Sequence, residues 1–294
     1  MKPFLKWAGG KRQLLPYIKK YINKKKIGKH KYYEPFLGGG SIFFDLAHEN
    51  SSINDLNEEI INCYNVIKEN PDELIDLLKL HAEAHCKEYY YKIRSLDREE
   101  DYKFMDNITK AARTIYLNRT CFNGLYRVNK NGFFNTPIGR YVNPLICDEE
   151  NINEISYFLN NNDVTIMSKS FEFAVEKCEK GDWIYFDPPY DYENSGFVGY
   201  VKEGFSHEDL VKLKEVCDEL VKKGCYVLVS NNDTEFVRQT FNSSDYEIIY
   251  STKTIKANRN INSKASKRKK VDEVLIYGHK RKKQKNSISS SKWF

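Results

Sequence analysis

The feature that most constrains this chain is an apolar run that ends in one carboxylate and two consecutive prolines. Residues 183–186 read Trp-Ile-Tyr-Phe, and Asp187-Pro188-Pro189-Tyr190 follows directly. A short aromatic and apolar run after a Gly-Asp turn is typical of a buried strand in a parallel sheet. Neither proline can donate a hydrogen bond to a sheet and each fixes its own φ, so the chain is predicted to leave the sheet here.

The residues after this strand form a chemically coherent set. Open α/β sheets place ligands at the carboxyl ends of their strands. Asp187 and the Pro188 carbonyl would offer two acceptors there, and the Tyr190 ring a flat stacking face. Such a set suits a planar group with an exocyclic amine, such as a nucleobase extruded from its stack. A strand ending in an ordinary turn is the alternative, but the full four-residue string favours a functional site.

A second strand end has features of nucleoside binding. We expect a strand over 31–34, a glycine-rich turn over 35–40, a helix over 41–48 and a strand over 52–55 that ends in Asp55. Glycines let a ligand approach the backbone, and a carboxylate accepts ribose hydroxyls. The pattern Gly-x-Gly-x-x-Gly is absent, and no Gly-Lys-Ser/Thr follows. A single nucleoside is therefore favoured over a dinucleotide or a P-loop nucleotide, with a purely structural glycine turn as the alternative.

Two further segments carry weaker signals. In residues 4–11 two glycines and Lys11 precede a helix expected over 12–23. The backbone N–H groups at the start of this helix can hold a carboxylate, although an ordinary turn explains the glycines equally well.

Residues 118–143 alternate arginines, asparagines and aromatics with glycine turns. Arg can pair with guanine, Asn with adenine, and an exposed aromatic can wedge between bases. Nucleic-acid contact is favoured there over a twisted hairpin with a satisfied polar face.

Charge is distributed unevenly along the 294 residues. The net charge is +6, and residues 264–294 hold eleven Lys/Arg against two acids, a net +9, so residues 1–263 carry −3. This asymmetry suggests a polyanionic partner, with a solvated basic tail as the alternative. Arg268, Lys269 and Lys270 are predicted to touch phosphates at low sequence specificity. Residues 280–294 are basic and serine-rich and are predicted to be disordered.

Composition excludes several classes of protein. No apolar run approaches membrane-spanning length, and the N-terminus lacks the apolar core of a signal peptide. The seven cysteines are scattered without a Cys-x-x-Cys, which fits a reduced, cytoplasmic protein. His81 and His85 are four apart, but the pattern is not His-Glu-x-x-His and no third ligand is near, so a solvated helix is favoured over zinc. We expect no metal.

Three motifs together resemble a known family. Phe4–Lys11, Glu34–Gly40 and Asp187–Tyr190, in this order and separated by the 118–143 segment, resemble the Dam-type DNA adenine-N6 methyltransferases of the D12 class, alpha group. The likeness covers residues 4 to about 277. The segment Asn118–Arg127, with Gly139-Arg140-Tyr141 after it, is similar to the members that methylate adenine in GATC.

The resemblance implies an α/β fold with a Rossmann-like S-adenosylmethionine-dependent methyltransferase sheet. This sheet would be mostly parallel with an antiparallel edge hairpin. The catalytic domain would be discontinuous, over 1–58 and 160–279, with an inserted, mainly helical DNA-recognition domain over 59–159 and a basic tail over 280–294. Double-stranded DNA is the implied partner, in a cytoplasmic, nucleoid-associated location and without a membrane. Whether a separate cognate restriction nuclease exists stays open.

The implied cofactor is S-adenosyl-L-methionine, with S-adenosyl-L-homocysteine as the product. Lys11 would lie near its carboxylate, Asp55 would hold the ribose hydroxyls, and Phe171 would lie against its adenine. The full set implied to bind it is Trp7, Lys11, Glu34, Pro35, Phe36, Gly38, Gly40, Asp55, Phe171 and Asp187. Ser170 stands where relatives often have an acid, and residues 191–196 depart from the commoner Pro-Leu-Ser pattern.

The resemblance also implies the catalytic and DNA-binding residues. Asp187 and the Pro188 carbonyl would accept the two hydrogens of the target amine, and Tyr190 would stack on the flipped adenine for direct in-line methyl transfer. Base edges would be read by Lys6, Asn123, Leu125 and Arg127, with Phe122 beside the gap. Arg119, Asn129 and Arg140 would hold the DNA backbone. The alternatives are a methyltransferase for RNA or a protein amide, a catalytically silent DNA-binding protein, and an NAD-dependent oxidoreductase.

Overall fold

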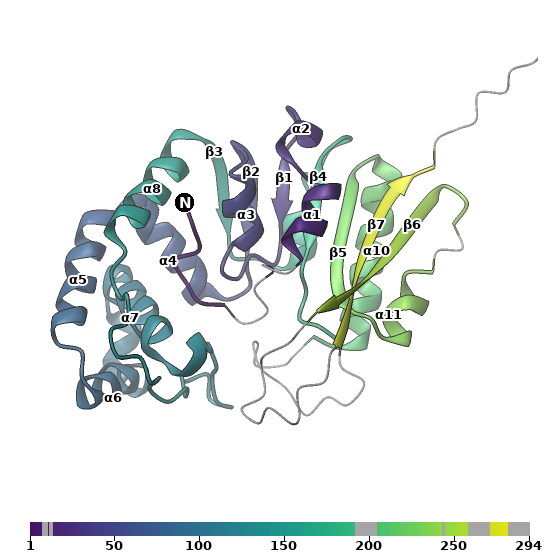
Figure 1. Ribbon diagram of the computed structural model, residues 1–294. Helices are drawn as coiled ribbons and strands as arrows, with labels where there is room; N and C mark the ends of the chain where they lie inside the picture. The colour runs from purple at the N-terminus through teal and green to yellow at the C-terminus, as the bar shows by residue number, and fades with distance from the viewer. Residues whose placement is uncertain (8–10, 12–13, 192–204, 243–244, 258–270, 282–294) are drawn as a thin grey trace, which may run out of the picture.

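The computed structural model of the protein describes residues 1–7, 11, 14–191, 205–242, 245–257 and 271–281 (Figure 1). Within these ranges seven strands form one sheet in the order β3-β2-β1-β4-β5-β7-β6. The strands are β1 (Tyr32–Glu34), β2 (Asn50–Asn54), β3 (Asp163–Met167), β4 (Trp183–Phe186), β5 (Tyr226–Asn232), β6 (Ile248–Ala257) and β7 (Val271–Lys280).

The strands β1 to β5 run parallel to one another, and the antiparallel pairs all involve β7. β7 pairs antiparallel with β5, and β6 pairs antiparallel with β7 at the edge. The expected α/β fold, a mostly parallel Rossmann-like methyltransferase sheet with an antiparallel edge hairpin, is therefore confirmed.

Side chains alternate between the two faces of the sheet, as the period of a strand requires. On one face Tyr185 and Leu228 pack with α1 (Leu15–Tyr21), α2 (Lys24–Ile27) and α3 (Ser41–Leu46). On the other, Phe186 and Val229 pack with α9 (Phe171–Ala174), α10 (His207–Lys223) and α11 (Glu235–Thr240). β4 is buried on both faces, so every residue from Trp183 to Phe186 is apolar or aromatic.

A group of helices lies beyond β3, at the left of Figure 1. It holds α4 (Glu58–Glu69), α5 (Pro71–Glu83), α6 (Lys87–Ser95), α7 (Asn107–Thr120) and α8 (Glu149–Asn161), with short 3₁₀ turns at Leu96–Arg98, Glu100–Phe104 and Phe122–Gly124. The apolar faces of these helices form one buried cluster that continues to Phe43 on α3 and Ile53 on β2. None of the described helices is long and apolar enough to cross a membrane.

The helices of this group divide the chain partly as the sequence predicts. Residues 57–80 predict two helices, the second capped by Asn70 with Pro71 at its first position, and this division is confirmed, because α4 ends at Glu69 and α5 begins at Pro71, although the Asn70 side chain makes no capping hydrogen bond. Residues 87–117 predict a continuing polar, tyrosine-rich helix, and this prediction is wrong, because α6 ends at Ser95 and α7 begins at Asn107. The Asp106 carboxylate starts α7 afresh by accepting from the Thr109 N–H at 2.7 Å, and such a cap begins a helix without any glycine or proline.

The two histidines considered as metal ligands have other partners. His81 Nδ1 lies 2.8 Å from the Tyr89 hydroxyl, and His85 Nδ1 lies 2.9 Å from the Tyr116 hydroxyl. Burial lowers the pKa of His81 to about 4, so its ring is neutral at pH 7. Both imidazoles also pack against the ring of Tyr116 on α7, and His81 packs against the ring of Tyr89 on α6.

Candidate active site

The polar residues of interest gather at one edge of the sheet because neighbouring strands end there. β1, β2 and β4 run parallel to one another, so their carboxyl ends lie at the same edge of the sheet, the lower one in Figure 1. Glu34 is the last residue of β1, and Asp55 and Asp187 directly follow β2 and β4. Asp55 lies one residue beyond β2, where the expected strand had included it. This edge is where open α/β sheets bind ligands.

The Asp187 carboxylate is fixed through one of its two oxygens. Lys11 Nζ lies 2.9 Å from Oδ1, and the Ser230 hydroxyl donates to the same oxygen at 2.7 Å. Ser230 is held in turn by Tyr185, whose hydroxyl lies 2.9 Å from Ser230 Oγ. Within the described residues both contacts use Oδ1, which leaves Oδ2 as the acceptor for a ligand.

The turn after Asp187 is also held in place. The Tyr190 hydroxyl donates to Glu273 Oε2 on β7 at 3.2 Å, and Lys11 Nζ lies 4.2 Å from the centre of the Tyr190 ring. The Asp191 N–H donates to Asn231 at 3.0 Å, and the Thr234 hydroxyl donates to the Asp191 carboxylate at 2.7 Å. Burial raises the pKa of the Tyr190 hydroxyl, which therefore remains a donor.

The glycine-rich turn is shaped by the protein's own tryptophan. Gly38 has a φ of +50°, and a Cβ there would lie 2.7 Å from two atoms of the Trp7 indole. The Gly38 N–H donates to Asp55 Oδ2 at 2.8 Å, and the Asn57 N–H donates to Asp55 Oδ1 at 2.9 Å. Burial raises the pKa of Asp55 in spite of these two hydrogen bonds. The carboxylate is therefore fixed in orientation and keeps lone pairs for further donors.

Aromatic side chains adjoin this turn. The Phe36 and Phe171 rings lie 5.5 Å apart, and the Ser170 hydroxyl caps α9 by accepting from the Phe173 N–H. Asn54 ties the neighbouring loops together by donating to the Pro35 and Lys169 carbonyls, each at 2.9 Å. A fixed carboxylate, a glycine turn and aromatic faces fit the hydroxyls and the purine of a nucleoside, so the residues present fit S-adenosylmethionine.

Glu34 lies inside the protein at the end of β1. Its side chain is 2% exposed and accepts a hydrogen bond from the Tyr32 hydroxyl at 2.8 Å. Burial raises the pKa of this carboxyl to about 8, while the Tyr32 hydroxyl acts in the opposite direction and the nearby charge of Asp187 raises it further. Glu34 therefore holds a proton at pH 7, which avoids two like charges beneath the site.

This proton makes stability depend on pH. The folded protein binds it up to a pH of about 8, whereas the unfolded chain releases it near the ordinary pKa of 4.5. The contribution of the Glu34 proton to the free energy of unfolding is therefore full below pH 4.5 and is lost as the pH rises toward 8. Glu34→Gln cannot ionise, so we expect its free energy of unfolding, relative to wild type, to rise by about 3 kcal/mol between pH 5.5 and 8. Urea unfolding at both pH values measures this, and parallel pH profiles would contradict it.

The segment proposed to read DNA forms an irregular hairpin. Two isolated bridges, Cys121–Ile138 and Val128–Phe134, hold it together. Phe122 follows the Cys121 bridge at the open end of this hairpin, in the 3₁₀ turn Phe122–Gly124, and is 42% exposed. Asn123 has a φ of +55°, and the Leu125 carbonyl accepts a hydrogen bond from the Thr136 hydroxyl. Arg127 Nε donates to Asn135 at 2.6 Å, and Arg140 is exposed. The Asn129 side chain accepts from the N–H groups of Asn131 and Phe133.

The fold brings Lys6 to this segment from the other end of the sequence. Lys6 Nζ donates to the Arg119 carbonyl at 3.1 Å and lies 3.7 Å from the centre of the Tyr141 ring. Burial, followed by the charge of Arg119, lowers the pKa of Lys6. Arg119 donates to the Leu145 carbonyl at 2.6 Å. Arg268, Lys269 and Lys270, predicted to touch phosphates, lie outside the described residues.

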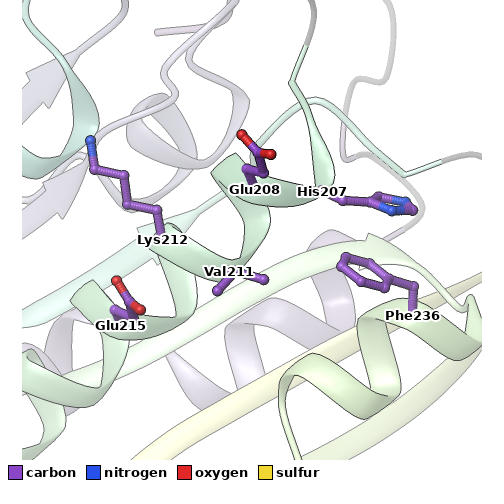
Figure 2. A pocket seen from close by; sticks show the side chains of 6 residues that line it. All are labelled: His207, Glu208, Val211, Lys212, Glu215 and Phe236. Carbon is purple, nitrogen blue, oxygen red and sulfur yellow. The ribbon is translucent and has the colours of Figure 1, made fainter.

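An open pocket of about 470 Å³ lies beside this site rather than in it (Figure 2). It is formed by α10 and α11, and the rings of His207 and Phe236 stack at one side, with centres 3.8 Å apart. His207 Nε2 also lies 3.1 Å from Asp191 Oδ1. The pocket therefore lies next to Asp191, the last residue of the turn after β4, but no residue predicted to be catalytic lines it.

Sequence reasoning missed the residues that hold Asp187 and Tyr190. Ser230, Asn231 and Asn232 form a polar run at the carboxyl end of the apolar strand β5, and the strand-end rule that selected Asp187 also applies to them. Glu273 follows Asp272 within β7 and gives no comparable signal, because charged residues in an antiparallel strand normally mark a solvated face.

Comparisons with known proteins identify the family of this chain. A model of the family of D12 class N6 adenine-specific DNA methyltransferases matches residues 7–261. The chain is 45% identical over 283 residues to the type II methyltransferase M1.LlaDCHI of Lactococcus lactis subsp. cremoris, covering 95% of this chain and 96% of that protein. It is 38% identical over 297 residues to the type II methyltransferase M.MjaIII of Methanocaldococcus jannaschii, covering 95% and 99%.

A third relative is named as a DNA adenine methylase and not as a type II methyltransferase. This protein of Escherichia coli is 32% identical over 279 residues, covering 93% of this chain and 94% of that protein. These matches decide against the NAD-dependent oxidoreductase considered from the sequence. The chain belongs to the D12 class of N6 adenine-specific DNA methyltransferases.

Proposed function

We propose that this enzyme transfers the methyl group of S-adenosylmethionine to the N6 amine of an adenine flipped out of duplex DNA, within the sequence GATC. The observation that carries this proposal is the Asp187 carboxylate, held at the end of β4 through Oδ1 and followed by the Tyr190 ring. When bound, S-adenosylmethionine supplies an electrophilic methyl group. The residues of the chain bind it, orient the amine and hold the base.

The N6 amine of adenine is a weak nucleophile because its lone pair is delocalised into the ring. Asp187 Oδ2 and the Pro188 carbonyl would each accept one amine hydrogen, which localises the lone pair and aims it. Ser230 and Lys11 are positioning residues here, since their contacts with Oδ1 fix the plane of the carboxylate. No cysteine nucleophile is needed for this direct transfer.

Base flipping accounts for the position of Tyr190. A base within a duplex cannot reach an acceptor at a sheet edge, so the target adenine would be extruded and stacked on this ring. Such stacking contributes about 1–3 kcal/mol. Because Lys11 Nζ lies 4.2 Å from the ring centre, the base would displace this ammonium or use the opposite ring face. The hydrogen bond from Tyr190 to Glu273 fixes the ring in either case.

The cofactor would lie along the glycine turn. Asp55 would accept the ribose hydroxyls, and Phe36 and Phe171 would offer faces to its adenine. Trp7, Glu34, Pro35, Gly38 and Gly40 would shape this turn. The close approach of Trp7 to Gly38 and the hydrogen bond from the Gly38 N–H to Asp55 support this role. We assign residues 1–58 and 160–279 to the catalytic domain and 59–159 to target recognition. The names of two relatives as type II methyltransferases favour a separate partner restriction nuclease.

The proposed target is tested by protection of plasmid DNA. Unmethylated plasmid is incubated with the enzyme and S-adenosylmethionine, then digested separately with one nuclease that cuts only unmethylated GATC and another that cuts only methylated GATC. We expect resistance to the first nuclease and sensitivity to the second. Unchanged digestion by both would refute GATC as the target, while label from the methyl donor would still reveal methylation elsewhere in the plasmid.

Arg127 is expected to determine sequence specificity. Its guanidinium is exposed and is oriented by the Asn135 amide oxygen at 2.6 Å. Arg127→Ala should reduce the discrimination between GATC and near-cognate sites by about 1–3 kcal/mol, the usual value of a bidentate contact to guanine. Competition between duplexes measures it. Arg140→Ala is the matched control, since loss of a backbone contact weakens binding to all sequences alike, and unchanged preference in Arg127→Ala would refute the role.

A further inference from the structure

We propose that Tyr126 is a positioning residue that couples target recognition to cofactor binding by holding Trp7 against the glycine turn. The inference rests on the proposed function and concerns how the two binding sites communicate. Tyr126 lies between Leu125 and Arg127, which are proposed to read base edges, yet its own ring contacts the cofactor side of the protein. It therefore belongs to both sites.

The N-terminal segment around Lys6 is attached to the recognition segment. The Lys6 N–H donates to the Asn118 side-chain oxygen at 2.7 Å, and the Asn118 amide donates back to the Lys6 carbonyl at 2.8 Å. The same amide donates to the Gly124 carbonyl at 3.2 Å. A Cβ on Gly124 would lie 2.3 Å from Lys6 Cβ, so the Gly124 backbone and the Lys6 side chain are in close contact. The segment therefore follows any movement of the recognition turn.

Trp7 transmits this contact to the cofactor side. On one side its ring lies 5.6 Å from the Tyr126 ring, at an interplanar angle of 33°. On the other side it covers the glycine turn, where a Cβ on Gly38 or Gly39 would lie 2.7 or 2.9 Å from Trp7 atoms. The indole thus lies between a ring of the recognition segment and the backbone expected to approach the cofactor.

A second route joins Tyr126 to the proposed ribose carboxylate. Burial raises the pKa of the Tyr126 hydroxyl, and the neighbouring Asn57 side chain acts in the opposite direction. The Asn57 N–H donates to Asp55 Oδ1 at 2.9 Å, and Asp55 Oδ2 accepts from the Gly38 N–H at 2.8 Å. The ring contact with Trp7 and the proximity of Tyr126 to Asn57 therefore lead to the same carboxylate and the same glycine. Ordering of Tyr126 on DNA would therefore order the cofactor turn.

Coupling of this kind is reciprocal and can be measured as a ratio of affinities. Titration calorimetry gives the affinity of the full-length enzyme for S-adenosylhomocysteine, with and without a GATC duplex. We expect the duplex to tighten binding by roughly tenfold in wild type, and by less than about twofold in Tyr126→Ala. Tyr126→Phe keeps the ring and removes the hydroxyl near Asn57, so its coupling should fall between the two.

The matched control is Tyr91→Ala, which removes another half-buried tyrosine from the same apolar cluster and lies on α6, away from the glycine turn. It should keep the wild-type ratio, and thermal unfolding shows that each variant is folded. A wild-type ratio in Tyr126→Ala, or no coupling in wild type, overturns the inference while leaving the proposed function intact. Wild-type enzyme that binds neither S-adenosylhomocysteine nor DNA, and methylates no adenine, overturns both.

Discussion

Asp187→Ala is expected to lower the rate of methyl transfer at least about 1,000-fold, while cofactor and DNA binding partly survive. The variant removes the acceptor that aims the amine, and losing a single preorganised electrostatic contact to a reacting group commonly costs a factor of about 100 to 1,000. Here the substitution also removes the carboxylate that Lys11, which is 7% exposed, contacts in the wild-type protein. Single-turnover transfer of labelled methyl to a duplex measures the rate separately from binding.

Asp45→Ala is a matched control for this variant. Asp45 on α3 pairs with Lys19 at 2.9 Å, the same separation as Asp187 and Lys11, and the two aspartate side chains are 22% and 21% exposed. Both variants therefore remove the acid of a Lys–Asp pair, but only one removes the proposed acceptor. Asp45→Ala should retain turnover. Retained turnover in Asp187→Ala would refute the proposed chemistry.

Gly38→Ala is expected to destabilise the protein by about 2–5 kcal/mol and to weaken cofactor binding. A left-handed φ costs an alanine about 1–2 kcal/mol, and forcing a methyl group into a packed site costs about 1–3 kcal/mol more. The second cost arises because the new Cβ would lie 2.7 Å from Trp7. Relief of this clash requires Trp7 or the turn to move. Urea unfolding and calorimetry with S-adenosylhomocysteine measure the two effects.

Gly28→Ala separates the two costs. Gly28 has a φ of +60° and a ψ of −122°, and apart from its chain neighbours no described residue has an atom within 4 Å of the position that a Cβ would take. Gly28→Ala should therefore show only a backbone cost, of about 1–3 kcal/mol, and unchanged cofactor affinity. Equal destabilisation in both variants, with equal cofactor affinity, would mean that the contact with Trp7 is not required for the turn.

The parts of the site that were predictable from sequence are those fixed by local chemistry. Two prolines after an apolar run determine where β4 ends, because neither can continue the hydrogen bonds of the sheet. The turn over 35–40 and Asp55 were predictable for a similar reason, since glycines and an acid follow two short strands. Ser206 is a residue type favoured at an N-cap and so predicts the start of α10, and the structure adds the reciprocal hydrogen bond, in which the Asp209 carboxylate accepts from the Ser206 N–H at 2.8 Å.

The parts that were not predictable depend on register over long separations. Ser230 reaches Asp187 across 43 residues and Glu273 reaches Tyr190 across 83, and both contacts depend on which strands are neighbours in the sheet. Lys6 and Asn118 are 112 residues apart and meet only because the N-terminal segment returns to α7. A single sequence shows which polar residues are present but not which of them form contacts in the folded protein.

The most direct test of the central claim is the chemical identity of the methylated product. Wild-type enzyme is incubated with methyl-labelled S-adenosylmethionine and a GATC duplex, and the DNA is hydrolysed to nucleosides and separated by chromatography. The label is expected to elute as N6-methyl-2′-deoxyadenosine. Label in a methylated deoxycytidine, or in the protein with none in DNA, would contradict the proposed chemistry.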